Sequence, residues 1–220
     1  ESTAGHQEHA YRLAAEKHLI QICSSVLAPT RRELQRLIEL NGRSTERFKV
    51  VGCGVDLERF RPQLRAVEYN QKVSQKRFAD LLFVGRFDSM KGLPDLLQSL
   101  ALLTKDNIDV KLVLIGGDGA DSSVRRDLAR QVDKLELAEK VVFHGRVPYA
   151  LLLTYYNDAN AVVLPSYYES FGLVTLEALA CGTPVAATRV GIAADVIVPG
   201  INGYLAEPGE PKSLARAIIS

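Results

Sequence analysis

Residues 161–187 read AVVLPSYYESFGLVTLEALACGTPVAA, and the architecture can be worked out from this pattern. Two short apolar runs, Ala161–Leu164 and Pro184–Ala187, flank a helical pattern over Gly172–Ala180 that glycine and proline end. Each run is too short for a helix. Continuous rather than alternating hydrophobicity is typical of strands buried on both faces, as in a parallel sheet. The pattern predicts a strand-helix-strand unit.

The same alternation continues from about Ala79 to the end of the chain. Further apolar runs lie at Leu81–Val84, Val110–Ile115 and Lys140–Phe143. Further helical patterns lie at Leu93–Leu103, Ser122–Leu135 and Pro148–Asn157. Repeated units of this kind predict an α/β fold with a doubly wound, Rossmann-like parallel sheet.

The first sixty residues have a different pattern, with two expected helices and one strand at Glu8–Ser24, Thr30–Leu40 and Phe48–Val51. These elements cannot bury a core alone. We therefore expect three segments: residues 1–60 as a largely helical remnant of an N-terminal domain, 61–78 as a polar interdomain linker, and 79–220 as the main domain. We expect both ends of the chain to be fragment boundaries.

Composition excludes several classes of function. The chain has 220 residues, 47% hydrophobic and 24% charged, with a net charge of +1. A charge this small does not attract nucleic acid, so any anion must be bound by a few placed groups. There is no signal-peptide pattern at the start. Three cysteines without metal-ligand spacing are expected to be buried thiols in a reducing compartment, which favours the cytoplasm.

The segment VGRFDSMKG (84–92) directly follows a predicted strand. Gly85 permits a tight turn, Arg86 offers a forked set of donors, and Lys91 adds a point charge before a helix N-terminus. Two cations beside the positive end of a helix suit a diphosphate. Solvated loop charges are the alternative interpretation.

Two further loops carry weaker signals. IGGDGADS (115–122) could present amides to an anion, but tight-turn glycines with Asp121 or Ser122 as a helix cap explain it equally well. Asp118 and Asp121 suggest a metal only weakly, because no third ligand is evident. His144, after another predicted strand, is more often a structural residue than a catalytic one, and no Ser-His-Asp or zinc pattern occurs.

The segment PSYYESFGLVTLEALACGTPV (165–185) combines two acids with a helix start. The amides of Gly172–Val174 point outward there, which predicts an anion site. Glu169 precedes the helix, so it and Glu177 should meet different parts of one ligand. Either acid could instead be an ordinary helix carboxylate. However, Glu177 lies in an apolar helix and needs a partner, which ribose hydroxyls would supply.

In combination, these motifs resemble glycosyltransferase family 4, the retaining group 1 glycosyl transferases with the GT-B fold. The matching elements are, in order, GRFDSMKG, IGGDG, FHGRVP, ESFGLVTLE, ALACGTPVAAT and GINGYLAEPGEP. They extend over about Ala79–Ser220. Upstream, KVVGCGVDLERFRP resembles the end of the family's N-terminal domain.

The resemblance implies that the chain binds a nucleotide-sugar donor, with a UDP-sugar as the first choice. It also implies that the donor binds without a metal or other cofactor. Arg86 and Lys91 would bind its diphosphate and stabilise the departing nucleoside diphosphate, Glu169 would orient the transferred sugar, and Glu177 would bind the ribose. The backbone at Arg146 and Val147 would border the base. Further donor contacts would come from the start of the helix, at Phe171, Gly172, Leu173 and Val174.

The family's acceptor site lies in an N-terminal domain that this chain almost wholly lacks. We therefore expect a hexosyltransferase in full-length form and a fragment that binds donor but transfers little or no sugar. No nucleic-acid partner is expected, and a membrane surface could be met only through the missing half. Two alternatives remain open: a nucleotide-sugar-binding module without turnover, and a sugar-nucleotide epimerase on the same fold.

Overall fold

A computed structural model of the chain describes residues 3–41, 46–63, 78–117 and 122–220. The chain divides into two compact units, Glu1–Cys53 and Gly54–Ser220. The boundary after Cys53 comes earlier in the chain than the division after residue 60 that the sequence predicts. Most of the predicted linker, residues 64–77, lies outside the described residues.

The first unit is a small βαβ arrangement preceded by a helix. It comprises α1 (Thr3–Ile22), β1 (Val26–Ala28), α2 (Arg31–Asn41) and β2 (Phe48–Val50). The two strands pair in parallel, and the Thr30 hydroxyl caps α2 by accepting a hydrogen bond from the Glu33 amide at 3.1 Å. Both expected helices are present, and the sequence pattern missed β1 because three residues are too few to show a period.

The second unit is built on a six-stranded parallel sheet in the order β5-β4-β3-β6-β7-β8. Its strands are β3 (Phe78–Gly85), β4 (Asp109–Gly116), β5 (Val141–Gly145), β6 (Ala161–Leu164), β7 (Val185–Thr188) and β8 (Gly203–Ala206). The predicted doubly wound α/β fold is confirmed. The edge strand β8 was not predicted, because its sequence, GYLA, lacks the continuous apolar character of the others.

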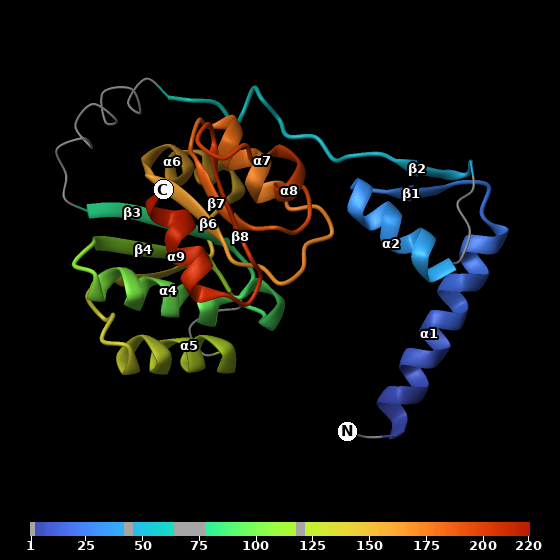
Figure 1. Cartoon of the computed structure of the whole chain (residues 1–220), viewed down its shortest axis with the longest axis horizontal. Helices are drawn as coiled ribbons and strands as arrows, with labels where there is room; N and C mark the ends of the chain where they lie inside the picture. The colour runs from blue at the N-terminus through green and yellow to red at the C-terminus, as the bar shows by residue number, and fades with distance from the viewer. Residues whose placement is uncertain (1–2, 42–45, 64–77, 118–121) are drawn as a thin grey trace. The chain divides into compact units, whose positions relative to one another are not determined.

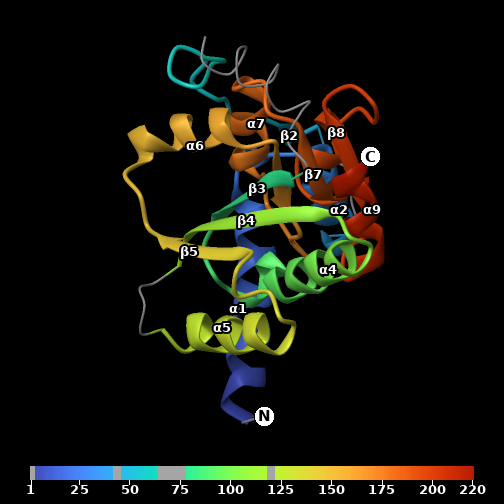
Figure 2. The ribbon, with the colours of Figure 1, turned by 90° about the vertical axis from the view of Figure 1, so that its left-hand side faces the viewer.

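Helices cover both faces of this sheet (Figures 1 and 2). One hydrophobic core packs α4 (Leu93–Lys105), α5 (Ser123–Lys134) and α9 (Pro211–Ile219) against the sheet. A second core lies on the other face and includes α6 (Leu152–Asp158), α7 (Leu173–Ala180) and α8 (Ala193–Val196). Two single-turn 3₁₀ helices, η1 (Ser89–Lys91) and η2 (Tyr149–Leu151), precede α4 and α6.

Residues 54–63, which we call the strap, belong to the second core. Phe60 is fully buried and meets the rings of Tyr149 and Tyr156 edge-on, with centroids 5.4 and 5.8 Å away. Asn157 on α6 fixes the end of the strap, because its amide nitrogen donates to the Arg61 carbonyl and its amide oxygen accepts from the Gln63 amide. The strap is therefore part of the packed structure of this unit.

The winding of the chain reverses between β3 and β6, the two central strands. In sheets of this type, ligands bind beyond the carboxyl ends of the strands at such a switch point. Here the loops after β3 and β6 are in contact. The Tyr167 amide donates to the Met90 carbonyl at 2.8 Å, and a Cβ atom on Gly92 would lie 2.0 Å from the Pro165 carbonyl oxygen.

Replacing Gly92 by alanine is expected to destabilise the protein more than the same change at Gly145. Both residues have positive φ, +62° and +86°, so each alanine incurs the left-handed backbone penalty of about 1–2 kcal/mol. Only at Gly92 does the new Cβ overlap a backbone atom, since nothing lies within 4 Å of a Cβ at Gly145. Urea unfolding followed by circular dichroism measures both, and equal losses would contradict the close contact at the switch point.

Candidate functional site at the switch point

An ion pair between Lys91 and Glu169 joins the two loops at the switch point. Lys91 Nζ lies 2.7 Å from Glu169 Oε1, and the two side chains are only 18% and 21% exposed. The Ser166 hydroxyl donates to the same oxygen at 2.9 Å. Oε2 receives no hydrogen bond from the part of the chain that the structure describes. The carboxylate is thus fixed through one oxygen and can accept a ligand hydroxyl at the other.

Local sequence explains where Lys91 lies. Asp88 caps η1, because its carboxylate accepts a hydrogen bond from the Met90 amide at 3.0 Å. Gly92 ends this turn in a left-handed conformation and begins α4 at once. Lys91 is therefore held between two helical turns, and its ammonium group reaches the loop after β6.

The residues before α7 form the other side of the site. Gly172 caps the helix with φ of +98°, and Phe171 before it is buried. The loop after β7 supports this turn, because the Ile192 amide donates to the Phe171 carbonyl at 2.6 Å and Gly191 leaves no room for a Cβ beside Glu169. Leu173 and Val174 form the first turn of α7, where backbone amides have no carbonyl within the helix to bind.

Arg86 and Gly85 lie at the end of β3 but outside this cluster. Arg86 is 79% exposed and pairs with Asp88 at 3.3 Å. The neighbouring strand β4 lies close against Gly85, because a Cβ atom on Gly116 would lie 1.9 Å from the Gly85 carbonyl oxygen. The structure thus brings Lys91 and Glu169 together, while Arg86 stands beside them at the same edge of the sheet.

Arg146 and Val147 follow β5 at the same edge. Arg146 Nε donates to the Gly117 carbonyl at 2.7 Å, which ties the loop after β5 to the loop after β4. Val147 is half-buried and packs against the second core. Asp118 and Asp121, the weak metal candidates, lie outside the described residues.

Glu177 is buried on α7 and accepts hydrogen bonds from two tyrosines. The Tyr149 hydroxyl donates to Oε1 and the Tyr156 hydroxyl to Oε2, both at 2.7 Å. The expectation that ribose hydroxyls would be its partner is therefore incomplete, because the protein itself supplies two donors. Sequence reasoning did not identify either tyrosine; the LLTYYND segment indicates only that a tyrosine there needs a partner for its hydroxyl if it is buried.

These contacts keep both phenols protonated. Burial, followed by the hydrogen bond to Glu177 and its charge, raises the pKa of Tyr149 to about 12. Burial is also the largest cause of the raised pKa of Tyr156, and the charge of Glu177 is the next. Both tyrosines therefore remain hydrogen-bond donors throughout the neutral pH range.

The cysteines differ in part from expectation. Cys181 is buried, and burial raises the pKa of its thiol to about 11, with a smaller effect from the charge of Glu177. Cys23 and Cys53 are exposed, so the prediction of three buried thiols was wrong for these two. Both lie in the first unit, where few side chains are buried.

Two other features of the described residues bear on function. A cavity of about 780 Å³ lies among α4, α5 and the start of α9, and none of the predicted site residues lines it. Among the helices of the described ranges, none combines the length and the hydropathy that a membrane crossing requires.

Comparison with known proteins identifies the family. The model of the family described as "Glycosyl transferases group 1" matches residues 36–220. The chain belongs to the group 1 glycosyl transferases. Two relatives named D-inositol 3-phosphate glycosyltransferase, from Xylanimonas cellulosilytica and Frankia alni, are 32% and 37% identical to it over 94% of the chain. The chain spans 50% and 52% of their lengths, so it matches about half of each.

Two solved structures show the same fold. Sucrose-phosphate synthase from Thermosynechococcus elongatus superposes with a TM-score of 0.81 at 31% identity, over 96% of this chain and 52% of that one. Anabaena HepE, solved in complex with UDP and glucose, superposes with a TM-score of 0.79 at 26% identity, over 94% of this chain and 56% of that one. The second unit is thus the Rossmann-like C-terminal half of a GT-B fold, as the sequence predicts.

At about pH 11, Tyr149 is expected to be only about one-tenth ionised, because its pKa is raised to about 12. The difference in phenolate absorbance between a protein with Tyr149 and the same protein with Tyr149→Phe measures the ionised fraction of Tyr149. This difference should be larger when Glu177→Gln is also present, because the negative charge next to the phenol is then removed. Circular dichroism confirms that the fold persists.

Tyr167 is the matched control for this experiment. Burial and a hydrogen bond to Asp95 raise its pKa to about 12 as well, and Glu177 is not among the causes. Glu177→Gln should therefore leave the absorbance lost in Tyr167→Phe unchanged. An equal change at both tyrosines would indicate general loosening of the fold rather than a specific bond between Tyr149 and Glu177.

Proposed function

We propose that this chain is the donor-binding half of a retaining glycosyltransferase, and that a nucleoside-diphosphate sugar binds at the switch point. The observation that carries the proposal is the fixed pair of Lys91 and Glu169 beside the N-terminus of α7. A cation, an oriented carboxylate and a helix N-terminus together suit a diphosphate with a sugar attached. A UDP-sugar is favoured, because the structurally similar Anabaena HepE was solved in complex with UDP and glucose.

The proposed donor extends across the edge of the sheet. Its diphosphate is bound by Lys91, by Arg86 and by the first amides of α7, and no metal or cofactor is required. Its sugar donates a hydroxyl to the Oε2 atom of Glu169. Its ribose binds Glu177, and its base lies beside the backbone of Arg146 and Val147. Arg86 reaches the diphosphate from an exposed position, which its long side chain permits.

The proposed reaction is transfer of a hexose with retention of configuration. The bond between the anomeric carbon and the diphosphate oxygen breaks, and its electron pair stays on the diphosphate. The acceptor oxygen forms the new bond from the same face, and its proton passes to the leaving phosphate. Negative charge thus grows on the diphosphate as the bond breaks, so fixed cations and amides act mostly in the transition state.

The acceptor is proposed to bind in the half of the full-length enzyme that this chain does not contain. The chain spans about half the length of its relatives, so we propose that it binds donor but transfers little or no sugar by itself. A small phosphorylated acceptor is favoured, because the name of several relatives, D-inositol 3-phosphate glycosyltransferase, specifies such a compound. A cytoplasmic location is part of the same proposal.

Arg86→Ala is expected to weaken UDP binding by about tenfold to a hundredfold, which corresponds to the loss of one charged hydrogen bond of about 1.5–3 kcal/mol. Calorimetric titration of the chain with UDP measures this. Arg130→Ala is the matched control, because Arg130 on α5 is as exposed as Arg86, at 79%, and also pairs with an aspartate of its own segment. No binding of UDP by the unaltered chain, or equal affinity in both variants, would refute the proposed role of Arg86.

Glu169→Gln and Glu177→Gln are expected to separate the sugar from the nucleoside. Glu169→Gln breaks the ion pair with Lys91 and so affects both ligands in the same way, but only UDP-glucose also loses the contact to its sugar. UDP-glucose binding should therefore weaken by about tenfold relative to UDP binding. Because Glu177 binds the ribose, its change should weaken both ligands by a similar factor. Titrating both variants with both ligands tests the assignment, and the reverse pattern would show that the donor lies in the opposite direction.

A further inference from the structure

The two oxygens of Glu177 differ in how they can be reached from solvent. Tyr156, which bonds Oε2, is completely buried, and Glu177 itself is 4% exposed. Tyr149, which bonds Oε1, is 50% exposed. The Oε1 side of Glu177 is therefore covered by the more exposed of the two tyrosines, whose hydroxyl donates a hydrogen bond there.

We propose that Tyr149 competes with the donor's ribose for Glu177 and thereby sets the affinity for the nucleotide. This inference rests on the proposed function, because it assumes that a ribose binds this carboxylate. A ribose diol and a phenol are both hydroxyl donors, and each seeks the same carboxylate oxygen. The ribose can take its place only when the Tyr149 hydroxyl moves aside.

The position of Tyr149 in the fold suits such a movement. It lies on η2, a turn of three residues without a side-chain cap, between β5 and α6. Tyr156, in contrast, lies within α6, is held on all sides by the second core, and cannot move without disrupting that core. The structure thus combines one fixed tyrosine, which orients Glu177, with one exposed tyrosine, which can leave it.

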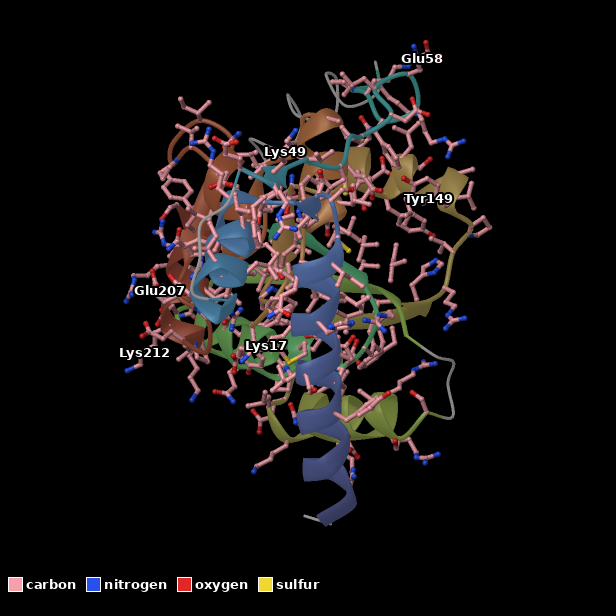
Figure 3. The ribbon with its side chains drawn as sticks, turned by 90° about the vertical axis from the view of Figure 1, so that its right-hand side faces the viewer. Lys17, Lys49, Glu58, Tyr149, Glu207 and Lys212 are labelled. Carbon is pink, nitrogen blue, oxygen red and sulfur yellow. The ribbon has the colours of Figure 1, made fainter. Side chains whose placement is uncertain are left out.

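The strap provides the surface against which the ring of Tyr149 rests. The Arg59 guanidinium lies 5.3 Å from the ring centroid, and Phe60 meets the ring edge-on. Figure 3 labels Tyr149 and the strap residue Glu58, both toward the upper right of the view. The strap thus contacts the ring of Tyr149, and these contacts do not involve its hydroxyl, so the hydroxyl can change partner.

The Tyr149→Phe variant separates the two contributions. It keeps the ring and its contacts with Arg59 and Phe60, but it removes the hydroxyl that occupies Oε1. We expect this variant to bind UDP about threefold to tenfold more tightly, the range for one net hydrogen bond. Tyr156→Phe is the matched variant, and its effect on UDP affinity should be the opposite. It removes the hydrogen bond that orients Glu177, so UDP should bind more weakly.

A matched ligand tests whether the effect acts through the ribose. The 2′,3′-dideoxy analogue of UDP keeps the base and diphosphate but cannot donate to Glu177. Tyr149→Phe should therefore leave its affinity unchanged while that for UDP increases. Equal or weaker binding of UDP by Tyr149→Phe would overturn the proposal, as would an equal gain for both ligands.

A measurement on the unaltered chain covers the case in which a variant does not fold. UDP that displaces Tyr149 from Glu177 removes one cause of the raised pKa of this phenol, so saturating UDP should increase phenolate absorbance at about pH 11. UDP binding without this increase would refute displacement. If calorimetry detects no UDP binding to the unaltered chain, the proposed function fails before the role of Tyr149 is reached.

Discussion

The close approach of the loops after β3 and β6 is the constraint on which the rest of the site depends. There is no room for a side chain between Gly92 and the Pro165 carbonyl, and the hydrogen bond from the Tyr167 amide to the Met90 carbonyl holds the two loops together. This contact exists only because β3 and β6 are neighbours in the sheet, although about eighty residues separate them in the chain. It brings the Lys91 ammonium to Glu169, and Glu169 in turn lies against the turn that starts α7. A shift of either loop would separate cation, carboxylate and helix start together.

The second organising interaction is the pair of tyrosines on Glu177. A buried carboxylate is costly unless hydrogen bonds satisfy it, and here each oxygen has one donor. Since Tyr156 belongs to the core under α6, the same packing that stabilises the unit also fixes the direction of Glu177. The stability of this unit and the direction of Glu177 thus depend on one network, in which one tyrosine is buried in the core and the other is exposed.

The sequence predicts most strands and helices of the second unit, because these are continuous apolar runs or clear helical periods. It misses β1, β8 and the four-residue helix α8, which are short or weakly apolar. The pairing of the two strands is a property of the sheet rather than of the segment. Lys91 and Glu169 are both candidates from sequence, but their mutual bond across 78 positions is visible only in the fold. Tyr149 and Tyr156 were missed as partners of Glu177, since contacts between different elements leave no local pattern. The site residues were assigned from the order of the motifs, and that order does not predict that Arg86 is exposed and pairs with Asp88.

The strap connects these levels of structure. Its sequence, GVDLERFRPQ, mixes charged residues with the apolar residues Val55, Leu57 and Phe60. Phe60 is fully buried and contacts both Tyr149 and Tyr156, and Val55 packs against the same core. The Phe60 ring supports the tyrosine that covers Glu177. A change in the path of the strap would therefore reach Glu177 through the ring of Tyr149, which Arg59 and Phe60 contact, without passing through the sheet.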